Sequence, residues 1–193
     1  MLVRPTLLAI VLLSLVACSS TSSLDYTPTV SVAPGPLAVS AVTASDMRNE
    51  KPNRLATVRG GYGNPVYVRD TARPVADEIA AVFTKALQAR GMLTMPGQAP
   101  YRVQLIVRDL HGNQYVTRNA YIDMDLIVAD RSGRTIYRDT VKNRSSEFTL
   151  FGMDVEDLQR LVQVLLNSTV DRMLDNPNFR AALSLSPPGA PLT

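Results

Sequence analysis

The 193-residue sequence has no tryptophan, one cysteine and one histidine. A single cysteine excludes an intrachain disulfide, and the lone histidine leaves carboxylates as the main side chains that can ligate a metal. Charges of the two signs are interspersed. Without Arg4 of the N-terminal segment, 19 of the 20 Lys and Arg residues remain, and the chain has 17 Asp and Glu residues. Without a basic stripe or a block of like charge, the sequence predicts no nucleic-acid binding.

A hydrophobic run long enough to cross a bilayer comfortably, which takes about 20 residues, is also absent. The apolar run at residues 7–17 is shorter, follows the positive charge of Arg4, and ends in Leu15-Val16-Ala17-Cys18. A charged start, a short apolar stretch and a small residue before the cut are typical of a secretory signal. Residues 1–17 are therefore predicted to be a signal peptide.

The residues before the cut resemble the lipobox of bacterial lipoproteins. In that class the cysteine thiol receives diacylglycerol, the peptide is cut before the cysteine, and the new amino group is acylated, commonly with palmitate. The resemblance implies lipidation of Cys18, and Ser19 in place of Asp implies sorting to the outer membrane. Three acyl chains anchor stably, whereas one binds marginally. The alternative is an ordinary signal peptide with a free Cys18, which is unusual in an oxidising compartment.

Three regions follow Cys18. Residues 18–36 are rich in Ser, Thr and Pro, which predicts a lipidated flexible tether, although the weak alternation at 26–32 would also suit an edge strand. Residues 37–183 are predicted to form a single periplasmic domain, and residues 184–193 a disordered tail.

Apolar periodicity predicts the elements of that domain. Period-two alternation favours strands at 37–42, 54–58, 66–68, 103–107, 122–128 and 135–147. Helical spacing favours one helix from between Thr71 and Pro74 to Gly91, and another from the N-cap Asp154 to Asn176, with a short turn to Leu183. Because apolar and polar residues alternate in each strand, one face of the sheet is expected to be apolar and buried. We expect an α+β two-layer sandwich: a mainly antiparallel sheet of about four to six strands with two amphipathic helices on one face.

Residues that carry chemistry are few. His111 follows Asp109 by two positions, but no serine or cysteine partner for a triad can be assigned, so a surface or turn role is favoured over catalysis. Asp123 and Asp125 form the best carboxylate pair for a metal such as calcium. On one strand face, however, they are better explained as ion-pair partners of neighbouring cations: Arg102, Arg108, Arg138 or Lys142. We expect no catalytic residue, metal or cofactor.

Two segments are candidates for contacts. The glycine-rich residues 60–63 lack the Lys-Ser/Thr of a phosphate loop, and a hairpin tip that exposes Tyr62 is favoured. The apolar run 148–153, with Phe151, either packs under the last helix or forms a patch for a protein partner. Basic residues surround the first segment and are either solvated or in contact with anionic lipid headgroups or peptidoglycan carboxylates: Arg54, Arg59, Arg69 and Arg73.

The succession of segments resembles one known family. The lipobox, the helix end Leu87-Gln88-Ala89-Arg90-Gly91, the strands 103–107 and 125–128 and the closing helix with 170–174 are similar, in order and spacing, to the YajG family of bacterial lipoproteins over residues 26 to 183. Met92 departs from the aromatic residue frequent there. The resemblance implies an outer-membrane lipoprotein, and no enzymatic activity or binding residues beyond Cys18.

Three functions remain open at this point. The favoured one is a non-catalytic, periplasm-facing interaction or accessory module of the cell envelope, bound to membrane lipid through Cys18 and to an envelope protein. A carrier of a lipid or muropeptide-like ligand requires a sizeable apolar pocket between helices and sheet. An enzyme requires His111 in a cleft beside Asp109 and a serine.

Overall fold

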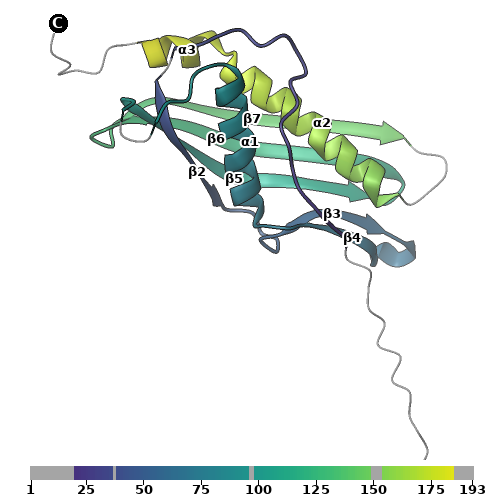
Figure 1. Cartoon of the computed structure of the whole chain (residues 1–193). Helices are drawn as coiled ribbons and strands as arrows, with labels where there is room; N and C mark the ends of the chain where they lie inside the picture. The colour runs from purple at the N-terminus through teal and green to yellow at the C-terminus, as the bar shows by residue number, and fades with distance from the viewer. Residues whose placement is uncertain (1–19, 37, 96–97, 149–153, 185–193) are drawn as a thin grey trace, which may run out of the picture.

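In the part of the chain that the structure describes, seven strands form one mixed sheet. This computed structural model describes residues 20–36, 38–95, 98–148 and 154–184. The strands are β1 (Ser20–Ser22), β2 (Val39–Asp46), β3 (Arg54–Arg59), β4 (Pro65–Thr71), β5 (Tyr101–Gln114), β6 (Thr117–Asp130) and β7 (Thr135–Phe148). The helices are α1 (Val75–Ala89), α2 (Val155–Leu174) and α3 (Pro177–Ser184), and the 3-10 turn η1 (Gly61–Gly63) joins β3 to β4. All three helices lie on one face of the sheet (Figure 1).

The strand order is β1-β4-β3-β5-β6-β7, and β2 also pairs with β5. The two longest ladders, β5–β6 and β6–β7, are antiparallel, and so is β3–β4. The pairs β1–β4, β2–β5 and β3–β5 are parallel. The predicted α+β class is confirmed. The sheet exceeds the expected four to six strands because β1, which belongs to the predicted tether, adds a seventh strand at one edge.

The strands β2 and β3 pair with different stretches of β5, and a buried arginine fills the gap between them. The Arg48 guanidinium donates to the carbonyl oxygens of Leu110 at 3.0 Å and Arg54 at 2.7 Å, and to Pro52 O at 3.0 Å. Asp46 accepts two further hydrogen bonds from Arg48, at 2.9 and 2.8 Å. Arg48 therefore donates hydrogen bonds to carbonyl groups in the gap between β2 and β3.

Local sequence explains the long elements. In β5, Val103, Leu105 and Val107 are buried on the helix side, as the period-two pattern predicts. The helix α2 begins at the predicted N-cap: Asp154 Oδ1 accepts hydrogen bonds from the backbone N–H of Glu156 at 2.9 Å and of Asp157 at 3.4 Å. The helix α1 follows Pro74, whose missing N–H is no loss at a helix start.

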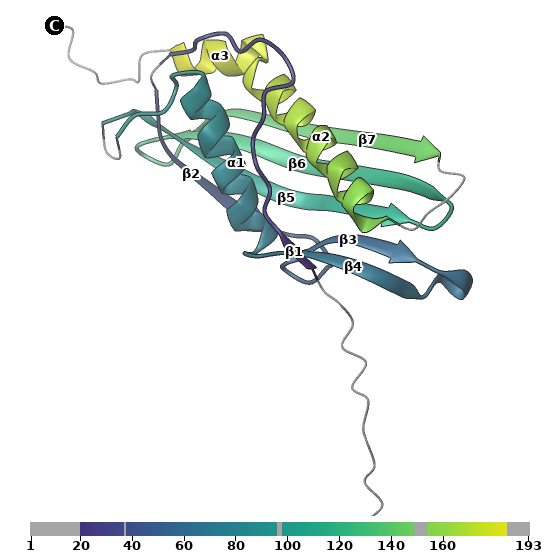
Figure 2. The same cartoon turned by 45° about the vertical axis from the view of Figure 1, so that its right-hand side comes forward.

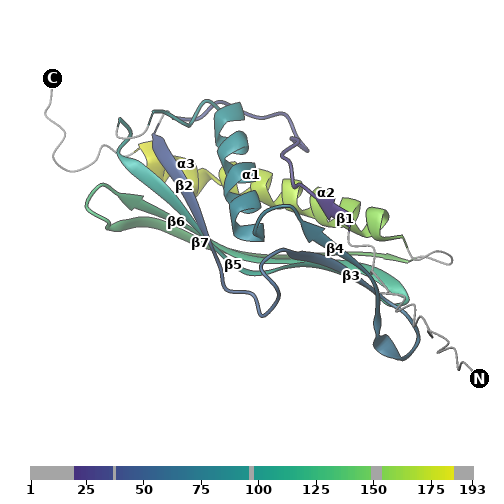
Figure 3. The same ribbon diagram turned by 60° about the horizontal axis from the view of Figure 1, so that its bottom comes forward.

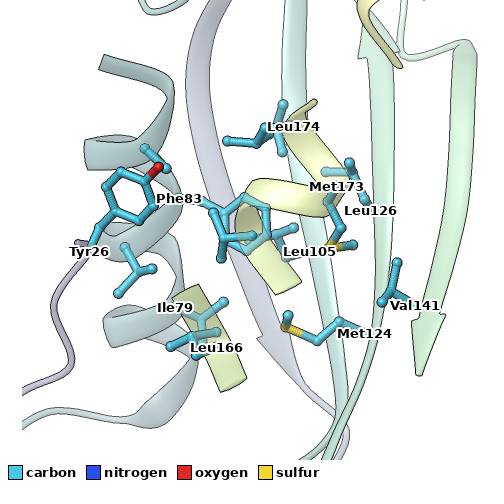
Figure 4. Packing of buried hydrophobic residues seen from close by; sticks show 14 of the residues in the cluster. Tyr26, Ile79, Phe83, Leu105, Met124, Leu126, Val141, Leu166, Met173 and Leu174 are labelled. Carbon is cyan, nitrogen blue, oxygen red and sulfur yellow. The ribbon is translucent and has the colours of Figure 1, made fainter. Parts of the chain in front are cut away.

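The core lies between the sheet and the helices α1 and α2 (Figure 4). Ile79 and Phe83 of α1 meet Leu105 of β5, and Leu166 of α2 packs beside them; none of these side chains is exposed. Each such side chain contributes about 1.5–3 kcal/mol relative to an exposed one. The face of the sheet opposite the helices carries mostly polar side chains and is not covered by a helix (Figure 3).

The segment predicted to be a flexible tether is fastened to the domain instead. Residues 23–36, which we call the N-terminal strap, follow β1 and run over α1 and α2 (Figure 2). Leu24 and Tyr26 are buried in the main core. The Leu24 N–H donates to Glu78 Oε2 at 3.2 Å, and the Gly35 N–H donates to Arg90 O at 2.9 Å. The tether prediction is therefore wrong for this segment, because its few apolar residues find burial on the helices. The edge strand also lies at 20–22 rather than at 26–32.

Candidate functional site

The predicted lipid attachment site, Cys18, and the predicted contact residue Phe151 both lie outside the described residues. The described chain begins at Ser20, the first residue of β1, which pairs with Arg69 of β4. Two residues of extended chain span at most about 7 Å. A lipid attached at Cys18 would therefore be joined to the chain within that distance of Ser20, at the edge of the sheet.

Three chain segments meet at one end of the sheet, which we call the hairpin end: the β3–β4 turn (60–64), the β5–β6 turn (115–116) and the last residue of β7. The register places them together, because Val58 pairs with Gln114 and Thr117 pairs with Phe148. In Figure 2 the three segments lie on the same side of the molecule. This end carries exposed tyrosine, valine and phenylalanine side chains.

Tyr62 lies at the tip of the β3–β4 turn, as predicted. Its side chain is fully exposed, and its backbone has a φ of 61°, in the left-handed region. The turn is closed by hydrogen bonds from the Gly60 N–H to Asn64 O at 2.9 Å and from the Gly63 N–H to Gly60 O at 3.1 Å. A bulky residue with positive φ costs about 1–2 kcal/mol. Tyr62 is thus presented to the outside at an energetic cost.

The basic residues near this turn form ion pairs and hydrogen bonds with other residues of the domain. Arg54 pairs with Asp70 at 2.7 Å, and the nearly buried Arg69 pairs with Glu156 of α2 at 2.8 Å. The other two also have partners: Arg59 donates to Gly63 O at 3.1 Å, and Arg73 pairs with Glu78 at 3.0 Å. The geometry favours structural roles for these residues over a patch that binds free anions.

Asp123 and Asp125 lie on the uncovered sheet face, in the ion pairs that the sequence predicts. Asp125 accepts from Arg108 at 2.7 Å, from Arg138 at 2.6 Å and from Thr140 Oγ1 at 2.8 Å, and its side chain is fully covered. The hydrogen bond from Arg108 is the main reason that the pKa of Asp125 lies well below its ordinary value, and it outweighs the opposing effect of burial.

Asp123 pairs with the exposed Lys142 at 2.9 Å. In the ranges that the structure describes, no group of three or more His, Cys, Asp or Glu side chains is placed to hold a metal. The interpretation of the two aspartates as ion-pair partners is confirmed.

Asp109 and His111 do meet, on the same uncovered face. His111 Nδ1 lies 2.5 Å from Asp109 Oδ1, and the imidazole stacks on the Tyr121 ring at 4.8 Å between centroids. The Arg144 guanidinium also lies over the Tyr121 ring, 5.0 Å from the ring centroid. A shallow hollow of about 350 Å³ lies beside the pair. Its described lining contains no serine or cysteine and consists of Asp109, Tyr121, Ile122, Asp123, Lys142, Asn143 and Arg144. This arrangement is a cross-strand stack and does not assemble a triad.

Sequence reasoning missed a buried charge cluster that fastens the strap. Arg90, at the end of α1, has no exposed side-chain surface and donates to Asp171 at 2.9 Å and to both oxygens of Asp175, at 3.0 and 2.9 Å. Asp171 also accepts from Tyr26 Oη at 2.5 Å and from the N–H and Oγ1 of Thr29, at 2.7 and 2.6 Å. The available signal was Asp171 itself, a carboxylate between Val170 and Met173 of the buried stripe.

Hydrogen bonds within this cluster stabilise the charged forms of both Asp171 and Arg90. Burial raises the pKa of Asp171, but the hydrogen bonds from Thr29, Tyr26 and Arg90 outweigh burial and hold that pKa below its ordinary value. Burial disfavours the charged form of Arg90, yet the hydrogen bonds that its guanidinium donates to Asp175, Asp171 and Tyr26 leave its pKa above the ordinary value. Both groups therefore stay charged, which is the condition for a stable buried pair.

Comparison with known proteins gives a family and a fold. Residues 36–184 match the model of a family described as an uncharacterized lipoprotein. A Xanthomonas campestris protein of the family DUF330 is similar in structure, with a TM-score of 0.54 and 17% identity over 77% of this chain and 91% of that one. The PelC dodecamer from Paraburkholderia phytofirmans matches at a TM-score of 0.44 and 10% identity, over 78% of this chain and 93% of that chain. No curated protein matches the chain.

None of the helices in the described ranges combines the length and the apolar character needed to cross a membrane.

Proposed function

The chain belongs to this family of uncharacterized lipoproteins, and from that premise we propose that it is a non-catalytic lipoprotein of the outer membrane. It faces the periplasm and serves the cell envelope as an interaction or accessory module. Within lipoproteins, the order of its segments supports a relation to the YajG family. Cys18 carries the acyl chains after removal of residues 1–17, and Ser19 directs the protein to the outer membrane.

The observation that carries the proposal is the position of β1. The described domain begins two residues after Cys18, and its first strand is paired with β4. The strap that follows is held by buried side chains and by Asp171. An anchor at Cys18 would therefore hold a folded body directly against the membrane surface rather than at the end of a loose chain.

A non-catalytic role is supported by the state of the polar residues. The carboxylates that sequence analysis singled out are bound to cations or to the lone histidine. The carrier hypothesis finds no such support, because core side chains such as Phe83 and Leu105 fill the space between helices and sheet where a ligand would lie. A surface hollow of about 210 Å³ between α2 and β7 is bordered by Arg118, Asp157 and Arg160 and is not suited to a lipid chain.

Labelling with palmitate in cells tests the anchor. We expect label in the wild-type protein and none in Cys18→Ala, which should leave the membrane fraction. Ser19→Asp is the matched control: it should keep the label and move from the outer-membrane to the inner-membrane fraction. An unlabelled wild-type protein would disprove the proposed anchoring, and a Ser19→Asp protein that stays in the outer membrane would disprove the proposed sorting.

The partner is tested by photo-crosslinking in cells. Gln104 is exposed on the uncovered face of β5, so that a probe there should capture an envelope protein if this face is used. Probes at Tyr62 and at Phe151 sample the two segments that sequence analysis favoured for contacts. The absence of a specific product at all three positions would contradict an interaction module.

A further inference from the structure

Exposed apolar side chains are concentrated at the hairpin end. Among the described residues, ten large hydrophobic side chains are exposed. Four of them belong to this end, and two more lie just beyond it at the start of β4: Tyr62, Tyr115, Val116 and Phe148, then Val66 and Tyr67. Four of the six are aromatic. Scattered exposed apolar residues need no explanation, but a cluster from three separate segments indicates a contact surface.

The chemistry of this cluster suits the interface of a membrane. Tyrosine is enriched where the ring meets acyl chains and the hydroxyl meets water. The two turns are also free of carboxylates: residues 57–69 and 110–122 contain Arg59, Arg69 and Arg118, but no Asp or Glu. In the third segment, Glu147 precedes Phe148 and lies opposite Arg118 in the β6–β7 register. Anionic headgroups would therefore meet no like charge from these turns.

The direction of β1 places the anchor toward the same end. β1 is parallel to β4, with Ser20 beside Arg69 and Ser22 beside Thr71, so that both strands run away from the β3–β4 turn. The start of β1 at Ser20 therefore points toward that turn. Since Tyr67 precedes Arg69 by only two residues on β4, Ser20 lies within a few residues of the apolar cluster.

We propose that the hairpin end rests on the lipid surface in which the acyl chains of Cys18 are inserted, with Tyr62 and Tyr115 in the headgroup region. This inference rests on the proposed lipidation. A bilayer is the occupant because an acylated Cys18 brings lipid within about 7 Å of Ser20, and because the fastened strap does not let the domain swing away. Acyl chains supply the affinity, and the turns set the orientation, in the manner of two-signal anchoring.

The absence of tryptophan provides a clean test. Full-length lipidated protein is reconstituted in vesicles of phosphatidylethanolamine and phosphatidylglycerol as three variants: Tyr62→Trp, Tyr115→Trp and the control Met95→Trp. Met95 is also exposed, but it precedes β5 and so lies toward the opposite end of the sheet. We expect brominated lipid to quench positions 62 and 115 several-fold more than position 95, and acrylamide to show the reverse order.

The outcomes separate the two proposals. Vesicle flotation of the wild-type protein against Cys18→Ala reports the anchor alone, and failure of the wild-type protein to float refutes both proposals. Flotation with equal quenching at all three positions leaves the anchor intact and refutes the orientation. Blue-shifted emission at position 62 that brominated lipid does not quench identifies a protein occupant, either a second copy or a partner, and likewise refutes docking on lipid.

Discussion

Removal of one carboxylate should release the N-terminal strap from the domain. Asp171 is almost fully buried and accepts four hydrogen bonds, three of which come from the strap: one from Tyr26 and two from Thr29. The fourth comes from Arg90. The variant Asp171→Ala therefore deprives the strap of its main polar attachment and leaves the buried guanidinium with fewer partners.

The size of the effect follows from what remains. Breaking a buried ion pair by removing one partner costs about 3–5 kcal/mol. Arg90 keeps both contacts to Asp175, which favours the lower limit. The orphaned donors of Tyr26 and Thr29 would each cost about 1–3 kcal/mol if they stayed buried. Detachment of the strap into water avoids that cost. We expect the free energy of unfolding to fall by about 3 kcal/mol, together with exposure of the strap.

Urea unfolding followed by circular dichroism measures the stability, and limited chymotrypsin cleavage after Tyr26 measures the release. Asp175→Ala is the matched control: it removes two hydrogen bonds from the same Arg90, but it has no contact with Tyr26 or Thr29. We expect the control to be less stable than wild type while its strap remains protected. A strap that stays resistant in Asp171→Ala, or that is cleaved equally in both variants, would refute the role assigned to Asp171.

Acid should have the same effect as the substitution. Because the pKa of Asp171 is lower in the folded protein than in the unfolded chain, its contribution to stability is complete above the ordinary aspartate pKa, about 3.9, and is lost as the pH falls through the folded value. We expect the hydrogen-exchange protection factors of the strap amides to fall below about pH 4 before those of the sheet. Simultaneous exchange of strap and sheet would contradict this order.

Three further predictions concern other parts of the fold. Gly112→Ala should cost about 1–3 kcal/mol, since its Cβ would lie 2.9 Å from Leu158 of α2, whereas Gly61→Ala, with open space around it, should change the urea midpoint little. Tyr62→Asn should leave stability unchanged or raise it by up to about 1 kcal/mol in the same assay, because asparagine tolerates positive φ. Burial and Asp139 raise the pKa of Tyr137 to about 12, so that its ring should ionise late in a titration followed by tyrosinate absorbance, as should Tyr26 and Tyr101, whose pKa values burial also raises. The stability that Tyr137 contributes below pH 10 is lost as the pH rises toward 12.

The parts of the fold that sequence predicts are those with a local cause. The alternation of apolar and polar residues predicted β5, β6 and β7, since successive side chains of a strand point to opposite faces of the sheet. The N-cap of α2 and its stripe were visible because capping and helical spacing involve residues within one or two turns. The pairing of Asp125 with Arg108 and Arg138 was predictable for the same reason, because neighbouring antiparallel strands bring alternating polar residues opposite one another.

The strap was not predictable in this way, since its structure depends on partners far away in the sequence. Tyr26 and Thr29 are bound by Asp171, more than 140 positions later, and Leu24 is bound by Glu78. A segment rich in Ser, Thr and Pro has the composition of a linker, and the free energy that orders it comes from α1 and α2. The local hints were Leu24, Tyr26 and the weak alternation at 26–32, which suggested an edge strand rather than a segment packed on the helices.

This long-range attachment changes what a lipid on Cys18 would do. A flexible chain of residues 18–36 would let the domain take any orientation above the membrane, and no surface would be preferred. With the strap held by Arg90 and Asp171, and β1 paired with β4, a lipid on Cys18 would be joined to a domain whose first strand is fixed in the sheet. The hairpin end, toward which the start of β1 points, would then meet the bilayer more often than any other end. Exposed aromatic side chains there would be stabilised by lipid, and at the opposite end they would contribute nothing to anchoring.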